Sequence, residues 1–315
     1  MNIAPAANDD RLSSPPRRSR RRTQDYVTVA LFLGPAFVLF LVFLVYPIFR
    51  SVYFSLFDWN GLGPAVDLVW LGNFRRILSD KVFIRAVGDC LLIVVLSLGI
   101  QLPLALALSI MVGRDLPGRA IFRTIFFMPY VLSEVITAII WMGLFSADPR
   151  RGLINALWIL IPGAQPQNFL SDIHQVMWCV FVVLSWKYFG LHMLLYLAGL
   201  QNIPKEIEEA ALIDGANRWQ LTRRITIPLL GGTIRTTVYL SVLGALTQFN
   251  LVWIMTRGGP VNASEFMATY MYRYGFIRFQ LGYGSAVALV MLLICLAFSI
   301  AYLRIARQGE YVGLI

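Results

Sequence analysis

Two ionisable side chains lie inside long apolar stretches of the sequence. Glu134 falls within residues 120–145, and Lys187 falls within residues 174–200. A charge in a hydrocarbon environment is costly unless it is paired or lines a polar cavity. At ~1.5 Å per helical residue, the two lie about 16 and 20 Å from the ends of their stretches at residues 145 and 174. An ion pair that fixes packing, a proton-coupling site and opposite walls of one ligand cavity are all consistent with this placement.

Polar and aromatic side chains accompany these charges. They are Ser241, Thr247, Gln248 and Asn250 in a later apolar stretch, and Trp186, Tyr188, Phe189 and His192 beside Lys187. Sugar hydroxyls need paired donors and acceptors, and the C–H faces of sugars rest on aromatic rings. The composition therefore suits a sugar. His192 is the exception, because a lone histidine on an apolar face is typically a hydrogen-bonded core residue.

The polar segment 201–228 carries the signals of two short helices. Pro204 suits a first helical turn. Gly215 can stop this helix by adopting a left-handed conformation, and Asn217 can cap a second helix over the next four residues. Pro228 closes the segment before the next apolar stretch. The sequence predicts a helix, a glycine turn and a second helix.

The first of these helices presents small and apolar residues on one face and carboxylates towards its positive end. The apolar face comprises Ile203, Ile207, Ala210 and Ala211, and the carboxylates are Glu206, Glu208 and Glu209. Further small residues at Gly215 and Ala216 permit close backbone approach. This pattern favours a helix pressed into the groove of a partner protein. An interfacial amphipathic helix without a partner is the alternative.

Six stretches are long enough to cross a bilayer core of ~30 Å as helices. They span residues 27–54, 86–112, 120–145, 174–200, 229–256 and 279–306. Prolines 47 and 103 fall inside two of them, where packing against neighbouring helices can tolerate the lost hydrogen bond. The predicted fold is all-α, a polytopic membrane protein with six transmembrane helices.

The composition agrees with a membrane protein, since 58% of the 315 residues are hydrophobic and 14% are charged. Ordinary soluble domains are about a quarter charged. The three cysteines are far apart in apolar stretches, which argues against a disulfide framework or a metal site. The net charge of +10 comes from basic residues beside the apolar stretches, so nucleic-acid binding is not indicated. The sequence has no GxxxxGK[ST] phosphate loop and no catalytic triad, and we expect no enzyme activity.

An even number of spans places both termini on one side of the membrane. With the termini inside, 16 of the 27 basic residues lie on inner segments, including the arginine cluster 17–22. Basic residues favour the cytoplasmic side, so we expect both termini to be cytoplasmic. Three parts follow: a disordered basic tail (1–24), a transmembrane domain (25–308) and a short cytoplasmic tail (309–315). The outer loops 55–85, 146–173 and 257–278 carry aromatic residues that mark the membrane interface or contact an extracytoplasmic partner.

Segment 201–228 resembles the binding-protein-dependent ABC importers, specifically the sugar-uptake permeases of the maltose and glycerol-3-phosphate type. The matching residues are Glu209, Ala210, Ala211, Gly215, Ile225 and Pro228, and Ala216 follows the glycine. Further similarity occurs at residues 123–130, 198–201, 213–216 and 256–260. The resemblance covers roughly residues 27–307.

This resemblance implies an importer-type permease fold in a bacterial inner membrane. It also implies partners: a second homologous permease, a dimer of ATP-binding subunits that carries the ATP and Mg, and an extracytoplasmic solute-binding protein. Segment 201–228 would dock the ATPase, and this chain would bind no cofactor itself. The implied substrate-pathway positions are Tyr130, Glu134, Lys187, Tyr188, Leu191, Ser241 and Gln248. In related importers often only one of the two permeases lines the sugar site, so the alternative role of these positions is packing.

Three other interpretations compete with a carbohydrate importer. The chain could be an importer permease for a non-sugar solute such as a peptide, ion or polyamine. It could be a secondary transporter in which Glu134 or Lys187 couples uptake to protons. An integral-membrane enzyme would need a reactive constellation at one depth, and the sequence shows none.

Overall fold

The computed structural model describes residue 29 and residues 31–113 and 118–312, without the side chains of residues 119 and 307–312. Within these residues the regular structure is helical, apart from one isolated bridge between Phe57 and Leu68. The all-α prediction is confirmed for this part of the chain. The expected tail 1–24 lies outside the described residues, and residues 309–312 belong to the last helix.

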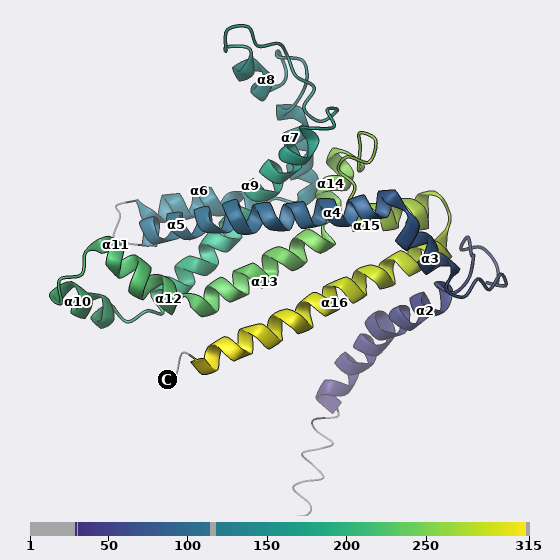
Figure 1. Ribbon diagram of the computed structural model, residues 1–315, viewed down its shortest axis with the longest axis horizontal. Helices are drawn as coiled ribbons and strands as arrows, with labels where there is room; N and C mark the ends of the chain where they lie inside the picture. Colours follow the sequence, from purple (N-terminus) through teal and green to yellow (C-terminus); the bar gives the residue numbers. More distant parts are fainter. Residues whose placement is uncertain (1–28, 30, 114–117, 313–315) are drawn as a thin grey trace, which may run out of the picture. The chain divides into compact units, whose positions relative to one another are not determined.

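Helices account for every predicted membrane stretch (Figure 1). In chain order they are η1 (Leu41–Val45), α2 (Tyr46–Phe54), α3 (Gly72–Ser79), α4 (Lys81–Leu96), η2 (Ser97–Gln101), α5 (Leu102–Gly113), α6 (Arg119–Val131), α7 (Glu134–Leu144), α8 (Leu153–Trp158), α9 (Val176–Gln201), α10 (Lys205–Ile213), α11 (Arg218–Leu221), η3 (Thr222–Thr226), α12 (Ile227–Leu229), α13 (Gly231–Thr247), α14 (Asn250–Met255), α15 (Met267–Tyr272), η4 (Arg273–Ile277) and α16 (Leu281–Val312). The η segments are π-helical turns.

Four helical stretches of the described chain are long and apolar enough to cross a membrane as they stand. They are Leu31–Phe54, Lys81–Gly113, Val176–Gln201 and Leu281–Ala306. Two further pairs reach that length only if each bent pair is one span: Ala120–Val131 with Glu134–Leu144, and Arg218–Leu229 with Gly231–Thr247. The four straight spans lie within a few residues of their predicted bounds, except that the second begins at residue 81 instead of 86.

The third and fifth predicted spans are each interrupted by a break in the helix. The third bends by 100° at Leu132 and Ser133, which adopt extended backbone conformations. Ser133 then caps α7 by accepting a hydrogen bond from the Ile136 N–H. In the fifth, α13 ends at Thr247, and an irregular backbone at Gln248 and Phe249 precedes α14. Hydrophobicity predicts the length of a span. The breaks come from single residues within it that adopt non-helical backbone conformations.

Three prolines inside helices each follow a π-helical turn. The turns are η1 before Pro47, η2 before Pro103 and η3 before Pro228. Proline lacks an N–H and crowds the carbonyl four residues back. A π turn shifts the hydrogen-bond pattern by one residue, and such turns are frequent at functional sites. These turns accommodate the prolines without ending the helices.

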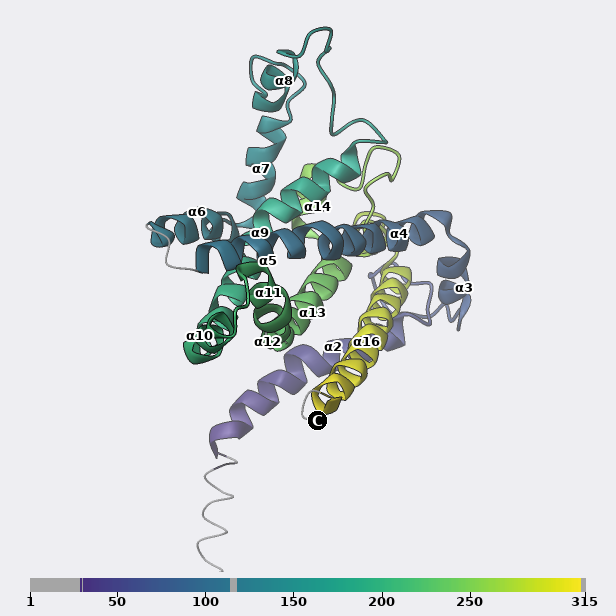
Figure 2. The ribbon, with the colours of Figure 1, turned by 60° about the vertical axis from the view of Figure 1, so that its left-hand side comes forward.

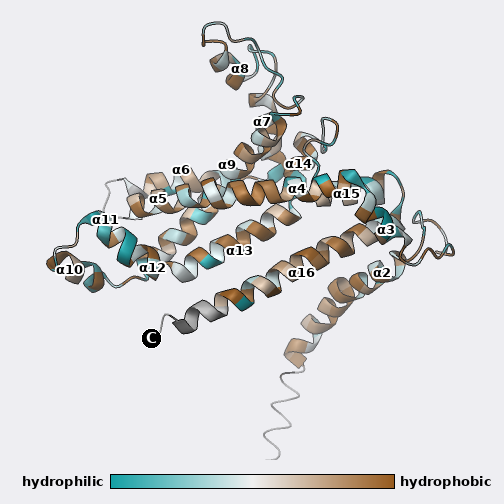
Figure 3. Cartoon of the chain, viewed as in Figure 1, coloured by the Kyte–Doolittle hydropathy of each residue, from teal (hydrophilic) through white to brown (hydrophobic). Residues whose placement is uncertain are grey.

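The chain divides into two units, residues 1–50 and 51–315, and the second contains the packed helices. There α9 is the central element, since it packs against α4, α5, α6, α7 and α13. In the most apolar 18-residue stretch of α9, 56% is buried, whereas the corresponding stretch of α16 is 11% buried. Helix α16 runs beside α13, as the two views show (Figures 1 and 2). Much of α16 therefore keeps an apolar surface for lipid or a partner, and its hydrophobic colouring contrasts with the polar region around α11 (Figure 3).

Helices α6 and α9 approach each other closely at Gly190 of α9. A Cβ there would lie 2.1 Å from the carbonyl oxygen of Phe126 and 2.8 Å from the Cα of Phe127 on α6. Since backbone cannot swing aside as a side chain can, any larger residue must push the two helices apart. Gly190 is thus the contact that allows α6 and α9 to touch.

We expect G190A to lower the free energy of unfolding by about 1–3 kcal/mol through overpacking. The measurement is thermal unfolding in detergent, followed with a thiol-reactive dye that reports exposure of the buried Cys90 and Cys179. The matched control is G143A on α7, where nothing lies within 4 Å of an added Cβ. Equal melting temperatures for G190A and G143A would show that the α6–α9 approach is not tight.

Candidate functional site

A cavity of about 340 Å³ lies between α4, η2, α9, α13 and the break after α13. Its lining combines apolar side chains with a set of polar ones. The polar set comprises Ser97, Gln101, Glu134, Tyr188, His192, Ser241, Thr247, Gln248 and Asn250. Binding cavities for small polar molecules typically have this composition, an apolar wall with a few placed polar groups.

A short chain of polar contacts crosses the cavity wall. The Tyr188 hydroxyl donates a hydrogen bond to Oε1 of Glu134, and it lies 3.5 Å from Oε1 of Gln248. Glu134 is the first residue of α7, Tyr188 projects from α9, and Gln248 occupies the break after α13. The two helix breaks therefore bring residues from three separate segments to one place.

Three buried polar atoms at this cavity have no hydrogen-bond partner within the described chain. They are the amide Nε2 atoms of Gln101 and Gln248 and the Nδ1 atom of His192. Buried polar groups are nearly always paired, and an unpaired one costs about 1–3 kcal/mol. All three side chains belong to residues that line the same cavity. The cavity therefore offers hydrogen-bonding capacity that water or a polar solute can use.

Lys187 lies beside the cavity but does not line it. Its side chain is 3% exposed, and its ammonium donates to the carbonyl oxygens of Pro129 (3.3 Å), Tyr130 (3.0 Å) and Leu132. These carbonyls lie at the end of α6, where the bend leaves them without helical partners. A cation at the C-terminal end of a helix is also favoured by the helix dipole. Lys187 therefore stabilises the break in the third span.

The structure sorts the seven predicted pathway residues into two groups. Glu134, Tyr188, Leu191, Ser241 and Gln248 line the cavity, whereas Tyr130 and Lys187 do not. Of the alternatives for Glu134 and Lys187, the structure shows neither a direct ion pair nor a shared cavity wall, because the two side chains bond to other partners.

Sequence reasoning missed two polar residues of the cavity, Ser97 and Gln101. Both lie on the π-helical turn η2 within the second span and are buried. The available signal was a glutamine inside an uncharged apolar stretch, which marks a packed or solvent-lined position in a membrane helix.

Segment 201–228 forms the predicted helix, glycine turn and helix. Gly215 has a φ of +84°, its N–H donates to the Leu212 carbonyl, and the Ala216 N–H donates to the Ala211 carbonyl. This hydrogen-bond pair is a Schellman motif that closes α10. Asn217 and Gln220 form a capping box at the start of α11, as expected for Asn217. Pro204 precedes α10 as its N-cap, and Pro228 lies two residues before the 66° bend into α13.

Four large apolar side chains of this segment are exposed, and sequence reasoning did not single out the two most exposed ones, Ile213 and Trp219. Ile213 is 86% exposed at the end of α10, and Trp219 is 69% exposed on α11. The predicted apolar face of α10 is only partly exposed. Ala211 is buried against the rest of the chain, whereas Ile207 and Ala210 are exposed. Glu209 and Ile225 lie on the same segment, the first exposed and the second half-buried. Exposed apolar residues next to exposed charges are typical of a protein-binding surface.

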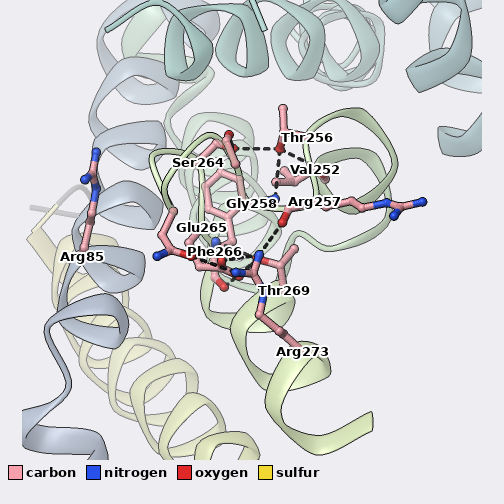
Figure 4. A network of polar contacts seen from close by, with 12 residues as sticks. Arg85, Val252, Thr256, Arg257, Gly258, Ser264, Glu265, Phe266, Thr269 and Arg273 are labelled. Atoms are coloured by element: carbon pink, nitrogen blue, oxygen red, sulfur yellow. Dashed lines mark hydrogen bonds and ion pairs between the residues drawn. The ribbon is translucent and has the colours of Figure 1, made fainter. Parts of the chain in front are cut away.

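The loop between α14 and α15 is held by a buried ion pair (Figure 4). Glu265 is fully buried, and its Oε2 lies 2.7 Å from Nη2 of Arg273. Burial raises the pKa of the Glu265 carboxyl, while the Thr269 hydrogen bond and the Arg273 charge oppose this shift. Gly258 has a φ of +78°, and a Cβ there would lie 2.4 Å from Glu265 Oε2. Glycine at position 258 therefore leaves room for the pair.

Residues 99–308 match the family described as "Binding-protein-dependent transport system inner membrane component". The chain belongs to this family. It is a permease subunit of the membrane part of a transport system, which agrees with its apolar helices and cavity.

Individual relatives support this assignment over nearly the whole permease. The chain is 33% identical to "Probable ABC transporter permease protein PH1215" of Pyrococcus horikoshii, over 92% of this chain and 99% of the relative. It is 34% identical to "Lactose transport system permease protein LacF" of Rhizobium radiobacter, over 93% and 98%. The fold is similar to that of a permease chain from a bacterial ABC transporter involved in the import of the acidic polysaccharide alginate. That match has a TM-score of 0.79 and 23% identity, over 93% of this chain and 99% of the other.

Proposed function

We propose that this chain is the permease subunit of an ATP-driven carbohydrate importer. It forms the solute path with a second, homologous permease and receives solute from an extracytoplasmic binding protein. A dimer of ATP-binding subunits carries the ATP and Mg²⁺ and docks on segment 201–228, which lies with both chain termini on the cytoplasmic side. Family membership and the lactose-transport relative support a sugar as the cargo.

The observation that carries this proposal is the direct connection between segment 201–228 and the cavity. The segment begins where α9 ends, at Gln201, and it leads into α13 at Gly231. Helix α9 bears Tyr188 and His192, and α13 bears Ser241, so both walls of the cavity continue into one segment. Each path is roughly 15–20 Å of helix at ~1.5 Å per residue.

This arrangement suits a mechanical mechanism. Closure of the ATPase dimer on ATP would move the docked segments of both permeases. The attached helices would then shift, and the cavity would change from inward-facing to outward-facing access. Solute released by the binding protein would enter the outward-facing cavity and find the unpartnered amide and imidazole groups described above.

The test is purification of the tagged chain from its native membrane in mild detergent. We expect it to co-purify with a second permease and an ATPase, and ATP hydrolysis by this complex should rise several-fold when sugar-loaded binding protein is added. Purification of a complete, folded chain that carries neither partner would contradict the proposal.

A further inference from the structure

The cavity contains one formal charge among the described residues that line it, the carboxylate of Glu134. The other polar lining groups are hydroxyls, amides and the His192 ring. Glu134 is held in place by the Tyr188 hydroxyl, which donates to its Oε1. This hydrogen bond fixes the orientation of the carboxyl group at the cavity wall.

The charges of Lys187 and Glu134 attract each other, but Lys187 does not line the cavity. It precedes Tyr188 on α9, and its ammonium donates to carbonyls at the end of α6. A lysine ammonium has three N–H donors, and three carbonyls accept from it here. Among the described residues, the Glu134 carboxylate is therefore the charged group at the cavity surface, where it would repel a solute of like charge.

We infer that Glu134 makes this chain's part of the solute path selective by charge, so that the solute it admits carries no negative charge. The inference rests on the proposed function and deepens it: the substrate class is an uncharged sugar, and uronates and sugar phosphates are rejected. The importer fold does not impose this selection, because a relative of the same fold serves the acidic polysaccharide alginate. Side chains in the path must therefore decide it, and Glu134 is the charged one on this chain.

The test measures the potential inside the cavity with a cysteine reporter. T247C places a thiol at an exposed residue of the lining, in a background where the half-buried Cys295 is replaced by alanine. The assembled transporter in membrane vesicles is treated with a cationic (trimethylammonium-ethyl) or an anionic (sulfonatoethyl) methanethiosulfonate, and the two reaction rates are compared.

We expect the cationic reagent to react faster, and E134Q should lower the ratio of the two rates by about tenfold or more. The matched control is D67N, which neutralises an exposed carboxylate in the loop after α2, outside the cavity, and should leave the ratio unchanged. A ratio that E134Q does not change would overturn the inference while leaving the proposed pathway intact. If neither reagent reaches T247C, the proposed pathway itself is contradicted, and the inference falls with it.

Discussion

An I213E variant should lose at least nine-tenths of its co-purifying ATPase while this chain itself folds normally. Ile213 ends α10 with 86% of its surface exposed, so a glutamate there disturbs no contact within the chain. If the side chain enters an apolar groove of the ATPase, the variant must bury a carboxylate without a partner, which is strongly unfavourable. A tenfold loss of binding corresponds to only about 1.4 kcal/mol, well within that cost.

The measurement is the ratio of ATPase to permease after affinity purification of the tagged permease. I213L is the matched control, because it keeps an apolar side chain of equal size and should retain the partner. W219E tests the neighbouring exposed side chain in the same way. Full retention of the ATPase by both I213E and W219E would exclude this surface as the docking site.

K187M should produce the largest loss of stability among the substitutions considered. The methionine preserves the apolar stem but leaves the carbonyls of Pro129, Tyr130 and Leu132 without their donor. Each unsatisfied buried acceptor costs about 1–3 kcal/mol, so we expect a total of roughly 3–9 kcal/mol. The whole stability of a typical domain is about 5–15 kcal/mol, and much of the protein should fail to fold.

The measurement is the yield of monodisperse protein together with the thermal unfolding assay used for G190A. K81M is the matched control, because Lys81 is exposed at the start of α4. The helix dipole does not stabilise a cation at that end, so its loss should cost little. K187R tests whether another basic side chain can stabilise the break. We expect its yield and melting temperature to lie between those of K187M and the unmodified protein. A K187M protein with the yield and melting temperature of K81M would show that Lys187 does not support the break.

The local structure of segment 201–228 was predictable because its signals are local. Gly215 and Asn217 act on residues within five positions of themselves, through a Schellman motif and a capping box. Both motifs follow from residue type and spacing alone. The exposed side chains of Ile213 and Trp219 were not predictable in the same way, because exposure depends on which neighbours the rest of the fold supplies.

The cavity was only partly predictable because it depends on two helix breaks. Hydropathy predicts one span over residues 120–145 and does not indicate the break at Leu132 and Ser133. Once the span bends, the carbonyls at the end of α6 need a donor, and Lys187 supplies it. Long-range geometry of this kind cannot be predicted from the spacing of the residues, and it places Tyr130 and Lys187 outside the cavity lining.

In the proposed function, this permease couples ATP hydrolysis to the passage of a sugar. The most direct measurement is sugar accumulation in proteoliposomes that contain the complete complex. The binding protein is added at the extracytoplasmic face. We predict accumulation that requires ATP at the cytoplasmic face and continues when an ionophore collapses the proton gradient. Accumulation that persists without ATP and stops with the proton gradient would contradict the account and favour proton-coupled transport.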